Sequence, residues 1–316
     1  MSTATVNPNL AYGQGAARLR QRLREPGVVL APAVYDPMTA RIAEQIGYQA
    51  LFFGGWAQAA QLCTPEPFLS MTEVLEGVRL LTRSVSLPII ADIGGGYGEP
   101  AHVFRTIREC EFAGIAGVQL EDQAFPKRAH YHKWVEGVIS ESEMVDKITA
   151  AREARTAQDD NKIVIVGRTD ASLAEGFGGA VRRLNRYKEA GCDMLLFFPN
   201  NLEEARLAPK EIDAPLVHVQ AAGAWGRPIL TREQMEEFGY KMAFAALMVP
   251  MTQAKAMRET LTAYFETGRQ SETLEKDRDS RIWLESLLGL DQYYRIEERT
   301  TERDRRVMPG AAFHEG

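Results

Sequence analysis

The chain carries two adjacent carboxylates, Glu121 and Asp122, at the end of an apolar segment that begins at Gly117. The polar loop that follows contains side chains that bind anions or transfer protons, namely Lys127, Arg128, His130, Tyr131 and His132. Acidic groups at a strand end, followed by a basic loop, are typical of metal-assisted chemistry on small acids. Taken alone, the pattern fits equally well a strand that simply ends in solvent.

Strand and helix signals alternate along the chain. Short apolar segments predict strands at residues 28–35, 49–53, 87–93, 117–120, 162–166, 194–198, 215–219 and 242–247. Helix starts are marked by Asp36 before a proline, and by the capping boxes of Ser70 with Glu73 and of Ser140 with Glu143. Such alternation favours a parallel sheet closed into a (β/α)8 barrel of the TIM type, with an N-terminal helix and a C-terminal helical extension. The alternative is a doubly wound open sheet, which usually has a glycine-rich phosphate loop after its first strand, and residues 35–37 do not form one.

Barrel closure has a consequence for function, because the loops after all the strands meet at one face. Asp92, Glu121, Arg168 and Asn200 lie far apart in the sequence but follow or end different predicted strands. We therefore expect them in one mouth. This convergence favours the functional interpretation of the carboxylates.

Composition limits the class of protein. A formal net charge of -6 gives no general attraction to nucleic acid or to an anionic membrane. No apolar segment is long enough to span a membrane, and the N-terminus lacks the features of a secretory signal. Cys63, Cys110 and Cys192 are widely spaced, as expected for reduced thiols in a cytoplasmic protein. We expect a barrel domain over residues 1–270 and a C-terminal helical extension or arm over 271–316.

Several segments resemble, in order and spacing, the isocitrate lyase and phosphoenolpyruvate mutase superfamily, and most of all its methylisocitrate lyase branch. They are Val34-Tyr35-Asp36-Pro37, Phe53-Gly54-Gly55, Asp92 with Gly96-Tyr97-Gly98, residues 113–118 running into Glu121-Asp122-Gln123, Pro126-Lys127-Arg128, and Gly167-Arg168-Thr169-Asp170-Ala171. The resemblance implies an (α/β)8 barrel with Mg²⁺ at its mouth and Mn²⁺ as an alternative ion. It implies chemistry on C–C or P–C bonds of small 2-oxo or 2-hydroxy acids through a pyruvate-type enolate. It also implies a homo-oligomer, a tetramer or a dimer, which commonly exchanges a C-terminal helix.

The resemblance assigns roles to residues at the mouth. Asp92 matches the principal metal carboxylate, and Glu121 matches a second acidic position that acts largely through bound water. Arg168 matches the substrate-binding arginine, whose planar fork can bridge a carboxylate or an enolate oxygen. The backbone N–H groups of Gly54 and Gly55 resemble a cradle for a substrate carboxylate. The alternative for Arg168 is an ion pair with Asp170 at the rim.

The sequence departs from the family pattern at several of these positions. Gly94 stands where relatives usually have a second metal-facing aspartate, which predicts weaker Mg²⁺ binding or a changed water shell. Glu66 falls where the family has an aspartate, and Asn200 where the lyases tend to have glutamate. We include both among the substrate-binding candidates, with a pocket that is less acidic than that of relatives.

The largest departure is in the loop. Lyases of this branch carry a cysteine that donates a proton to the departing enolate, and this chain has Ala129 there. The candidate catalytic residues of the loop are Lys127, His130, Tyr131 and His132. Histidine titrates near neutrality, so either imidazole can donate a proton. The alternatives are that the histidines only bind the substrate's carboxylate or phosphate, or that they have no role.

Three function classes follow. The first is a Mg²⁺-dependent C–C lyase of methylisocitrate or dimethylmalate type that uses histidine or tyrosine in place of cysteine. The second is an oxaloacetate decarboxylase or an enzyme that processes phosphonopyruvate or carboxyphosphonoenolpyruvate, since such family members lack the cysteine. The third is a non-catalytic carboxylate-binding homologue, suggested by Gly94 together with Ala129. The apolar segment 282–288 and the charged segment 297–306 are interpreted as an inter-subunit arm or, alternatively, as a solvated helix end.

Overall fold

The computed structural model describes residues 14–128, 133–135, 137–156, 160–220, 226–269 and 278–303. Within these residues the chain forms two compact units. One unit ends at Met251, and the other contains the described residues from Thr252 onward. The domain boundary predicted between residues 270 and 271 therefore lies within the second unit, and the arm assignment stays a prediction.

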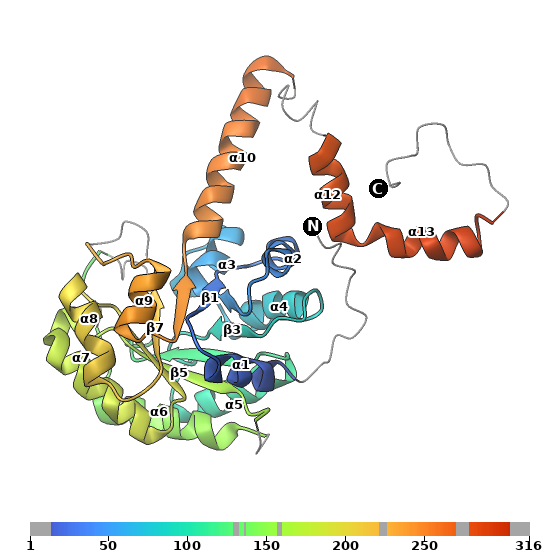
Figure 1. Cartoon of the computed structure of the whole chain (residues 1–316). Coiled ribbons are helices and arrows are strands. Elements are labelled where there is room, and N and C mark those ends of the chain that lie inside the picture. Colours follow the sequence, from blue (N-terminus) through green and yellow to red (C-terminus); the bar gives the residue numbers. More distant parts are fainter. Residues whose placement is uncertain are drawn as a thin grey trace. The chain divides into compact units, whose positions relative to one another are not determined.

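The described part of the chain contains one parallel, eight-stranded sheet. Its strands are β1 (Val29–Pro32), β2 (Leu51–Phe53), β3 (Ile89–Asp92), β4 (Gly117–Glu121), β5 (Val164–Thr169), β6 (Met194–Phe197), β7 (Leu216–Val219) and β8 (Met242–Ala245) (Figure 1). Strands β2 to β8 pair in chain order, and β8 pairs with β1. Val34 N donates to Phe52 O at 2.9 Å, and Ala33 forms a parallel bridge with Phe52. These contacts join β1 to β2 and close the barrel, which confirms the predicted fold class and rules out the open sheet.

Helices alternate with the strands along the chain, and those that precede residue 248 surround the barrel (Figure 1). They are α1 (Gly15–Arg24), α2 (Pro37–Ile46), α3 (Gly55–Gln61), the short 3-10 helix η1 (Glu66–Phe68), α4 (Met71–Thr82), α5 (Pro100–Phe112), α6 (Glu141–Ala154), α7 (Ser172–Ala190), α8 (Leu202–Glu211), α9 (Arg232–Phe238) and α10 (Met248–Thr267). The predicted starts of α2, α4 and α6 are confirmed, because Asp36, Ser70 and Ser140 each accept a hydrogen bond from the third helical N–H. These caps satisfy N–H groups that a helix cannot pair internally.

Two segments differ from the sequence prediction. The first strand was expected over residues 28–35 but β1 ends at Pro32, since the chain then leaves β8 to pair with Phe52. The sequence also predicts a helix over about residues 179–190, whereas α7 begins earlier, at Ser172. Gly176 interrupts it with φ +72°, a left-handed conformation that glycine adopts without strain. The first turn of α7 is thus separate from the rest of the helix, and the spacing of apolar residues does not predict it.

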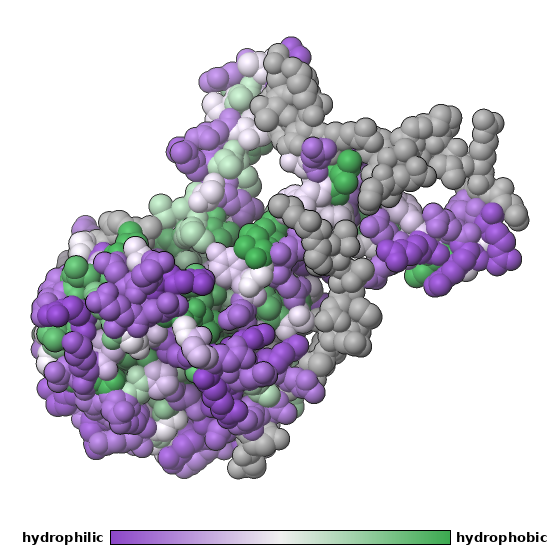
Figure 2. Space-filling view, viewed as in Figure 1, coloured by the Kyte–Doolittle hydropathy of each residue, from purple (hydrophilic) through white to green (hydrophobic). Residues whose placement is uncertain are grey.

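The strands are buried on both faces, as continuous apolar segments of a parallel sheet require. Hydrophilic side chains dominate the visible surface of the barrel unit in Figure 2. No described helix is both long enough and apolar enough to cross a membrane. The predicted cytoplasmic location stays a prediction.

The second unit contains α12 (Arg278–Leu288) and α13 (Leu290–Arg299), and α10 begins in the first unit and continues into the second. Large apolar side chains on α12 and α13 are exposed in the single chain, namely Trp283, Leu284, Leu288, Tyr293, Tyr294 and Ile296. The predicted apolar segment 282–288 is therefore helical and largely uncovered.

Candidate active site

The carboxyl ends of three neighbouring strands bring buried charges together. Asp92 ends β3, Glu121 ends β4, and Arg168 lies one residue before the end of β5. Arg168 Nη1 is 3.0 Å from Glu121 Oε2 and 3.9 Å from Asp92 Oδ2. Each of the three residues is at most 9% exposed. Residues from distant parts of the sequence thus share one site at the mouth of the barrel.

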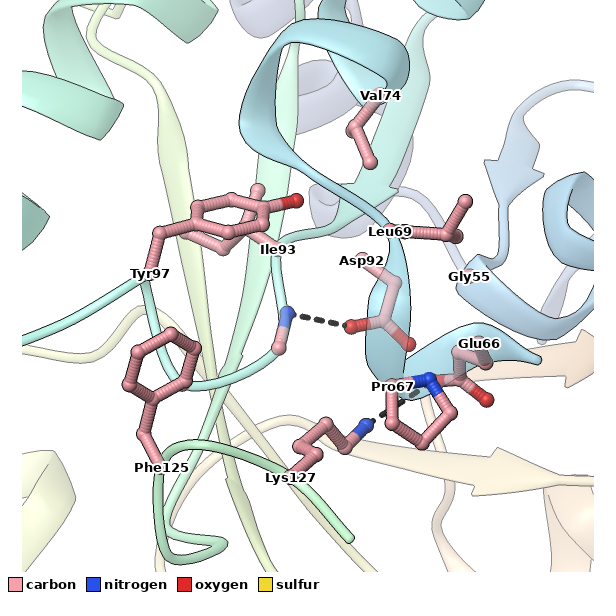
Figure 3. A pocket seen from close by; sticks show the side chains of 12 residues that line it. Gly55, Glu66, Pro67, Leu69, Val74, Asp92, Ile93, Tyr97, Phe125 and Lys127 are labelled. Carbon is pink, nitrogen blue, oxygen red and sulfur yellow. Dashed lines mark hydrogen bonds and ion pairs between the residues drawn. The ribbon is translucent and has the colours of Figure 1, made fainter. Parts of the chain in front are cut away.

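Lys127 and Glu66 complete this group, which we call the mouth cluster: Glu66, Asp92, Glu121, Lys127 and Arg168. Lys127 Nζ is 2.8 Å from Glu121 Oε1 and 3.0 Å from Glu66 Oε1. Figure 3 shows the ammonium group pointing from the loop after β4 toward Glu66, on η1. Glu121 thereby lies between two cations.

Asp92 is fixed by the turn that follows it. Its Oδ1 accepts a hydrogen bond from Gly94 N at 2.9 Å (Figure 3). Burial raises the pKa of Asp92, and the nearby negative charge of Glu121 raises it further, against the lowering effect of Lys127. The buried Lys147 of α6 donates to Gly95 O at 2.8 Å and holds the same turn. Lys147 was not predicted as a site residue, because nothing in the sequence distinguishes it from other lysines in helices.

Gly94 faces the mouth cluster. It has φ +52°, and a Cβ at this position would lie 3.8 Å from Glu121 Oε1 and 3.9 Å from Lys127 Cδ. These are ordinary van der Waals distances, so a side chain at residue 94 would begin beside the cluster. Residue 94 therefore faces the site, and in this chain it contributes no carboxylate where relatives usually have an aspartate.

Arg168 is oriented by a second carboxylate. Its Nη2 donates to Asp170 Oδ1 at 2.9 Å, and its Nε lies 2.9 Å from Asp170 Oδ2. Gln123 Nε2 donates to Asp170 at 3.1 Å. The alternative interpretation of Arg168 as a partner of Asp170 is correct as to the contact, but the pair is buried and leaves Nη1 directed at Glu121. A fork held on one side in this way presents its other side in a fixed direction.

Phe198, which follows β6, lies beside two guanidinium groups. The Cζ atom of Arg168 is 4.8 Å from the ring centroid, and that of Arg227 is 4.0 Å from it. Both distances suit cation–π contacts. Arg227 follows β7 and was not among the predicted site residues.

Asp122 lies on the opposite side of β4, since side chains alternate along a strand. Its carboxylate accepts hydrogen bonds from Thr169 Oγ1 at 2.6 Å, Asp170 N at 2.9 Å and Tyr187 OH at 2.7 Å. Arg183 Nη1 is 3.3 Å away. The expectation that the adjacent carboxylates act as a pair at the strand end is therefore wrong, because only Glu121 faces the mouth.

A cavity of about 40 Å³ opens beside Asp92. Its polar side is lined by Gly55, Glu66, Asp92 and Lys127, and its apolar side by Pro67, Leu69, Val74, Ile93, Tyr97 and Phe125 (Figure 3). A Cβ at Gly55 would lie 3.0 Å from Glu66 Oε1, so a larger residue here would press on the Glu66 side chain. The cavity thus joins charged groups to an apolar wall.

Of the remaining predicted site residues, Gly54 and Asn200 are described. Gly54 precedes α3 as its N-cap, and a Cβ there would be 2.8 Å from the Phe52 ring. The side-chain amide of Asn200 donates to Ser172 O at 3.3 Å, and its backbone N–H donates to Glu204. His130, Tyr131 and His132 lie outside the described residues.

The mouth cluster contains carboxylates of the kind that bind magnesium. Among the described residues, no group of three histidine, cysteine or acidic side chains is placed to hold a metal. Mg²⁺ is commonly bound through one or two carboxylates, with water and substrate oxygens as the other ligands. Asp92 and Glu121 offer those carboxylates, and a cation would offset both the burial and the negative charge of Glu121 that raise the pKa of Asp92. The residues fit a sparsely ligated ion rather than an all-protein cage.

Comparison with known proteins adds an independent line of support. Residues 19–265 match the phosphoenolpyruvate phosphomutase family. A 2-methylisocitrate lyase of Aeropyrum pernix is 35% identical over 94% of this chain and 93% of its own length. A 2,3-dimethylmalate lyase of Eubacterium barkeri is 34% identical over 78% of this chain and 85% of its own. A solved complex of phosphonopyruvate hydrolase with oxalate and Mg²⁺ has a TM-score of 0.79 at 27% identity, covering 91% of this chain and 99% of that one.

Proposed function

Because this chain belongs to the phosphoenolpyruvate phosphomutase family, we propose that it is a magnesium-dependent carbon–carbon bond lyase. Its substrate would be a small 2-hydroxy or 2-oxo di- or tricarboxylate of the methylisocitrate or dimethylmalate type, cleaved through a pyruvate-type enolate. The family match confirms the superfamily predicted from the motifs. The two lyase relatives support a lyase. The observation that carries the proposal is the buried group of Asp92, Glu121 and Arg168 at adjacent strand ends.

The chemistry explains the need for such a group. Breaking a C–C bond beside a carboxylate leaves an enolate, whose developing negative charge makes up much of the barrier. Bound Mg²⁺, or Mn²⁺ in its place, supplies positive charge to the substrate's oxygens. Asp92 and Glu121 would hold the ion, and Glu66 is near enough to accept hydrogen bonds from its water.

Arg168 and the glycines would orient the substrate. The Nη1 group of Arg168 faces the mouth, and its pairing with Asp170 prevents rotation away from it. Its N–H groups can donate to a substrate carboxylate or to the enolate oxygen. The backbone N–H groups of Gly54 and Gly55 would bind the other carboxylate oxygen, and Gly55 lines the cavity beside Asp92.

The proton that returns to the enolate carbon would come from the loop. Position 129 holds alanine instead of cysteine, so His130, Tyr131 and His132 are the proposed donors, with Lys127 as a further loop cation. His130→Ala and His132→Ala should each be tested for a fall in kcat that exceeds any rise in KM. Unchanged rates in both variants would leave Tyr131 or solvent as the donor.

The apolar wall of the cavity favours an alkyl-substituted substrate. Leu69, Val74 and Phe125 are among the apolar side chains that line the cavity (Figure 3). A methyl or ethyl group buried there gains roughly 0.8 kcal/mol per CH₂ group removed from water. This observation favours a methylisocitrate- or dimethylmalate-like acid over oxaloacetate, which has no alkyl branch.

Subunit association is a separate part of the proposal. Trp283, Leu284 and Leu288 on α12 are exposed in the single chain, and exposed apolar clusters commonly mark interfaces. A homo-oligomer, a dimer or a tetramer, would cover them. Mass measurement in solution tests this, and a monomer at micromolar concentration would refute it.

The deciding experiment is an assay of product release from a panel of acids with Mg²⁺ present. We expect pyruvate or glyoxylate from a 2-hydroxy diacid that carries an alkyl group, at a higher kcat/KM than from the unbranched acid. Phosphate release from phosphonopyruvate would instead support the activity named for the structural relative. Binding of acids without turnover of any, with Mg²⁺ or Mn²⁺, would refute the proposal and indicate a carboxylate-binding homologue.

A further inference from the structure

The mouth cluster already contains a cation supplied by the chain. The side chain of Lys127 is 9% exposed, and its ammonium group contacts Glu121 at 2.8 Å and Glu66 at 3.0 Å. A buried ammonium loses its hydration and is tolerated only where carboxylates compensate. Lys127 therefore occupies the place between carboxylates that a bound cation would otherwise fill.

The described segment on either side of Lys127 is exposed. Ala124, Phe125, Pro126 and Arg128 are exposed, so that Lys127 is the one side chain of segment 124–128 that is largely buried. Its withdrawal would break ion pairs but would leave the apolar core of the barrel intact. Such a segment can change position at a modest cost in free energy.

Gly94 leaves room for this arrangement. A Cβ at residue 94 would lie 3.9 Å from Lys127 Cδ, so the alkyl chain of the lysine passes beside the position where a longer side chain would extend. Glycine also contributes no carboxylate to compete for the ammonium or to bind a metal. The cluster thus has three acids, one fewer than it would have with an acid at residue 94, and two of the three, Glu66 and Glu121, contact Lys127.

We propose that Lys127 is an internal counter-ion that a divalent cation must displace from Glu121 and Glu66, so that metal binding releases segment 124–128. This inference rests on the proposed metal site. In the free protein the cation binds weakly, because it must break two buried ion pairs. Substrate oxygens add ligands to the cation, and linkage requires that substrate and metal then strengthen each other's binding.

The test compares two charge-removing variants of the full-length protein. Mn²⁺ binding without substrate is measured by titration calorimetry for the natural chain, Lys127→Met and Arg128→Met. Methionine keeps an unbranched side chain and removes the charge. Lys127→Met should bind Mn²⁺ roughly tenfold tighter or more, a change of about 1.4 kcal/mol. Arg128→Met removes the same charge from the exposed neighbour and should stay within about twofold of the natural chain, because solvent and salt screen it.

The opposite results would overturn the inference. Equal Mn²⁺ binding by Lys127→Met would show that the lysine does not compete with the ion, and weaker binding would show that the lysine supports the ion. Equal tightening by both variants would show a general charge effect. A second measurement needs no variant: amide hydrogen exchange at Phe125, Lys127 and Arg128 should become faster when Mn²⁺ binds. Unchanged or slower exchange would refute displacement even if Lys127→Met did not fold.

The same titration with oxalate separates this inference from the proposed function. Binding of Mn²⁺ by the natural chain with oxalate, but no difference between it and Lys127→Met without oxalate, would refute only the role of Lys127. No Mn²⁺ binding by either protein, with or without oxalate, would remove the metal site itself.

Discussion

Glu121 and Asp122 are neighbours in the chain, both are fully buried, and each lies beside a buried arginine, yet their surroundings differ. Asp122 accepts hydrogen bonds from a backbone N–H and from the hydroxyls of Thr169 and Tyr187. Glu121 is compensated by the long side chains of Lys127 and Arg168.

The difference separates structure from function. Hydrogen bonds from a strand and a packed helix fix Asp122, and any ligand that replaced them would have to unpack α7 from the barrel. The ion pairs of Glu121 come from groups that a ligand can compete with directly. We infer that Asp122, on the outer side of β4, stabilises the barrel, and that Glu121, on the inner side, serves the reaction.

The largest expected effect is on catalysis at the inner side. Asp92→Ala should lower kcat/KM by about 10³-fold or more, close to 4 kcal/mol of transition-state stabilisation, and should abolish metal dependence. The unfolding midpoint should change little, because the variant removes a carboxylate that burial and Glu121 disfavour. Steady-state kinetics and thermal unfolding measure both quantities. Retained activity would take Asp92 out of the mechanism.

The next effect is on stability at the outer side. Asp122→Ala should cost about 3 kcal/mol of unfolding free energy, because Tyr187, Arg183 and the Asp170 N–H lose a buried acceptor. Urea denaturation measures this loss. Glu121→Gln is the comparison on the inner side: turnover should fall, and the loss of stability should be smaller than that of Asp122→Ala, because Lys127 keeps its ion pair with Glu66 and Arg168 keeps its contacts with Asp170. Similar losses of stability in the two variants would contradict the comparison.

A third expectation concerns pH at the inner side. The pKa of Asp92 is raised by burial and by Glu121, so the carboxyl group holds its proton to a higher pH than usual. A metal must displace that proton, and Mn²⁺ affinity should therefore rise with pH across the neutral range, by up to roughly tenfold per pH unit. Titration calorimetry at several pH values, corrected for buffer ionisation, measures it. Affinity that does not depend on pH would show that Asp92 is already ionised.

The smallest expected effect comes from removing a single hydroxyl group, that of Thr169, on the outer side. Thr169→Val keeps the shape of the side chain but removes the hydrogen bond to Asp122, at a cost of about 1 kcal/mol in unfolding free energy. Turnover should be unchanged once the folded fraction is taken into account. If turnover fell without a loss of stability, the outer network would have to act on the mouth.

Local signals predicted much of the fold. Asp36, Ser70 and Ser140 each accept a hydrogen bond from the backbone N–H three residues later, so these helix starts can be predicted from neighbouring residues alone. Closure of the barrel followed from the number and order of the apolar segments. The start of α7 was predicted too late in the sequence, because Gly176, with its positive φ, separates the first turn of the helix from the rest.

The site was predictable where residues end strands, and less so where they do not. Asp92, Glu121 and Arg168 are brought together by strand order alone. The partners of Asp122 were not predictable, since Arg183 and Tyr187 come from a helix more than sixty residues away. One signal was present: an arginine and a tyrosine four residues apart share the buried face of α7, where apolar residues are usual. Insertion of the Lys127 side chain between carboxylates depends on loop conformation, which sequence patterns do not fix.

The ring of Phe198, in contact with the guanidinium groups of Arg168 and Arg227, bears on how an anion approaches. A chain of net charge -6 repels a dianion at long range. The guanidinium groups beside this ring add positive charge that partly offsets the carboxylates of the mouth cluster and so favours the approach of an anion. The rate at which an anionic substrate binds would then depend on this local charge rather than on the net charge of the chain. Added salt would slow substrate binding more than it slows the chemical step.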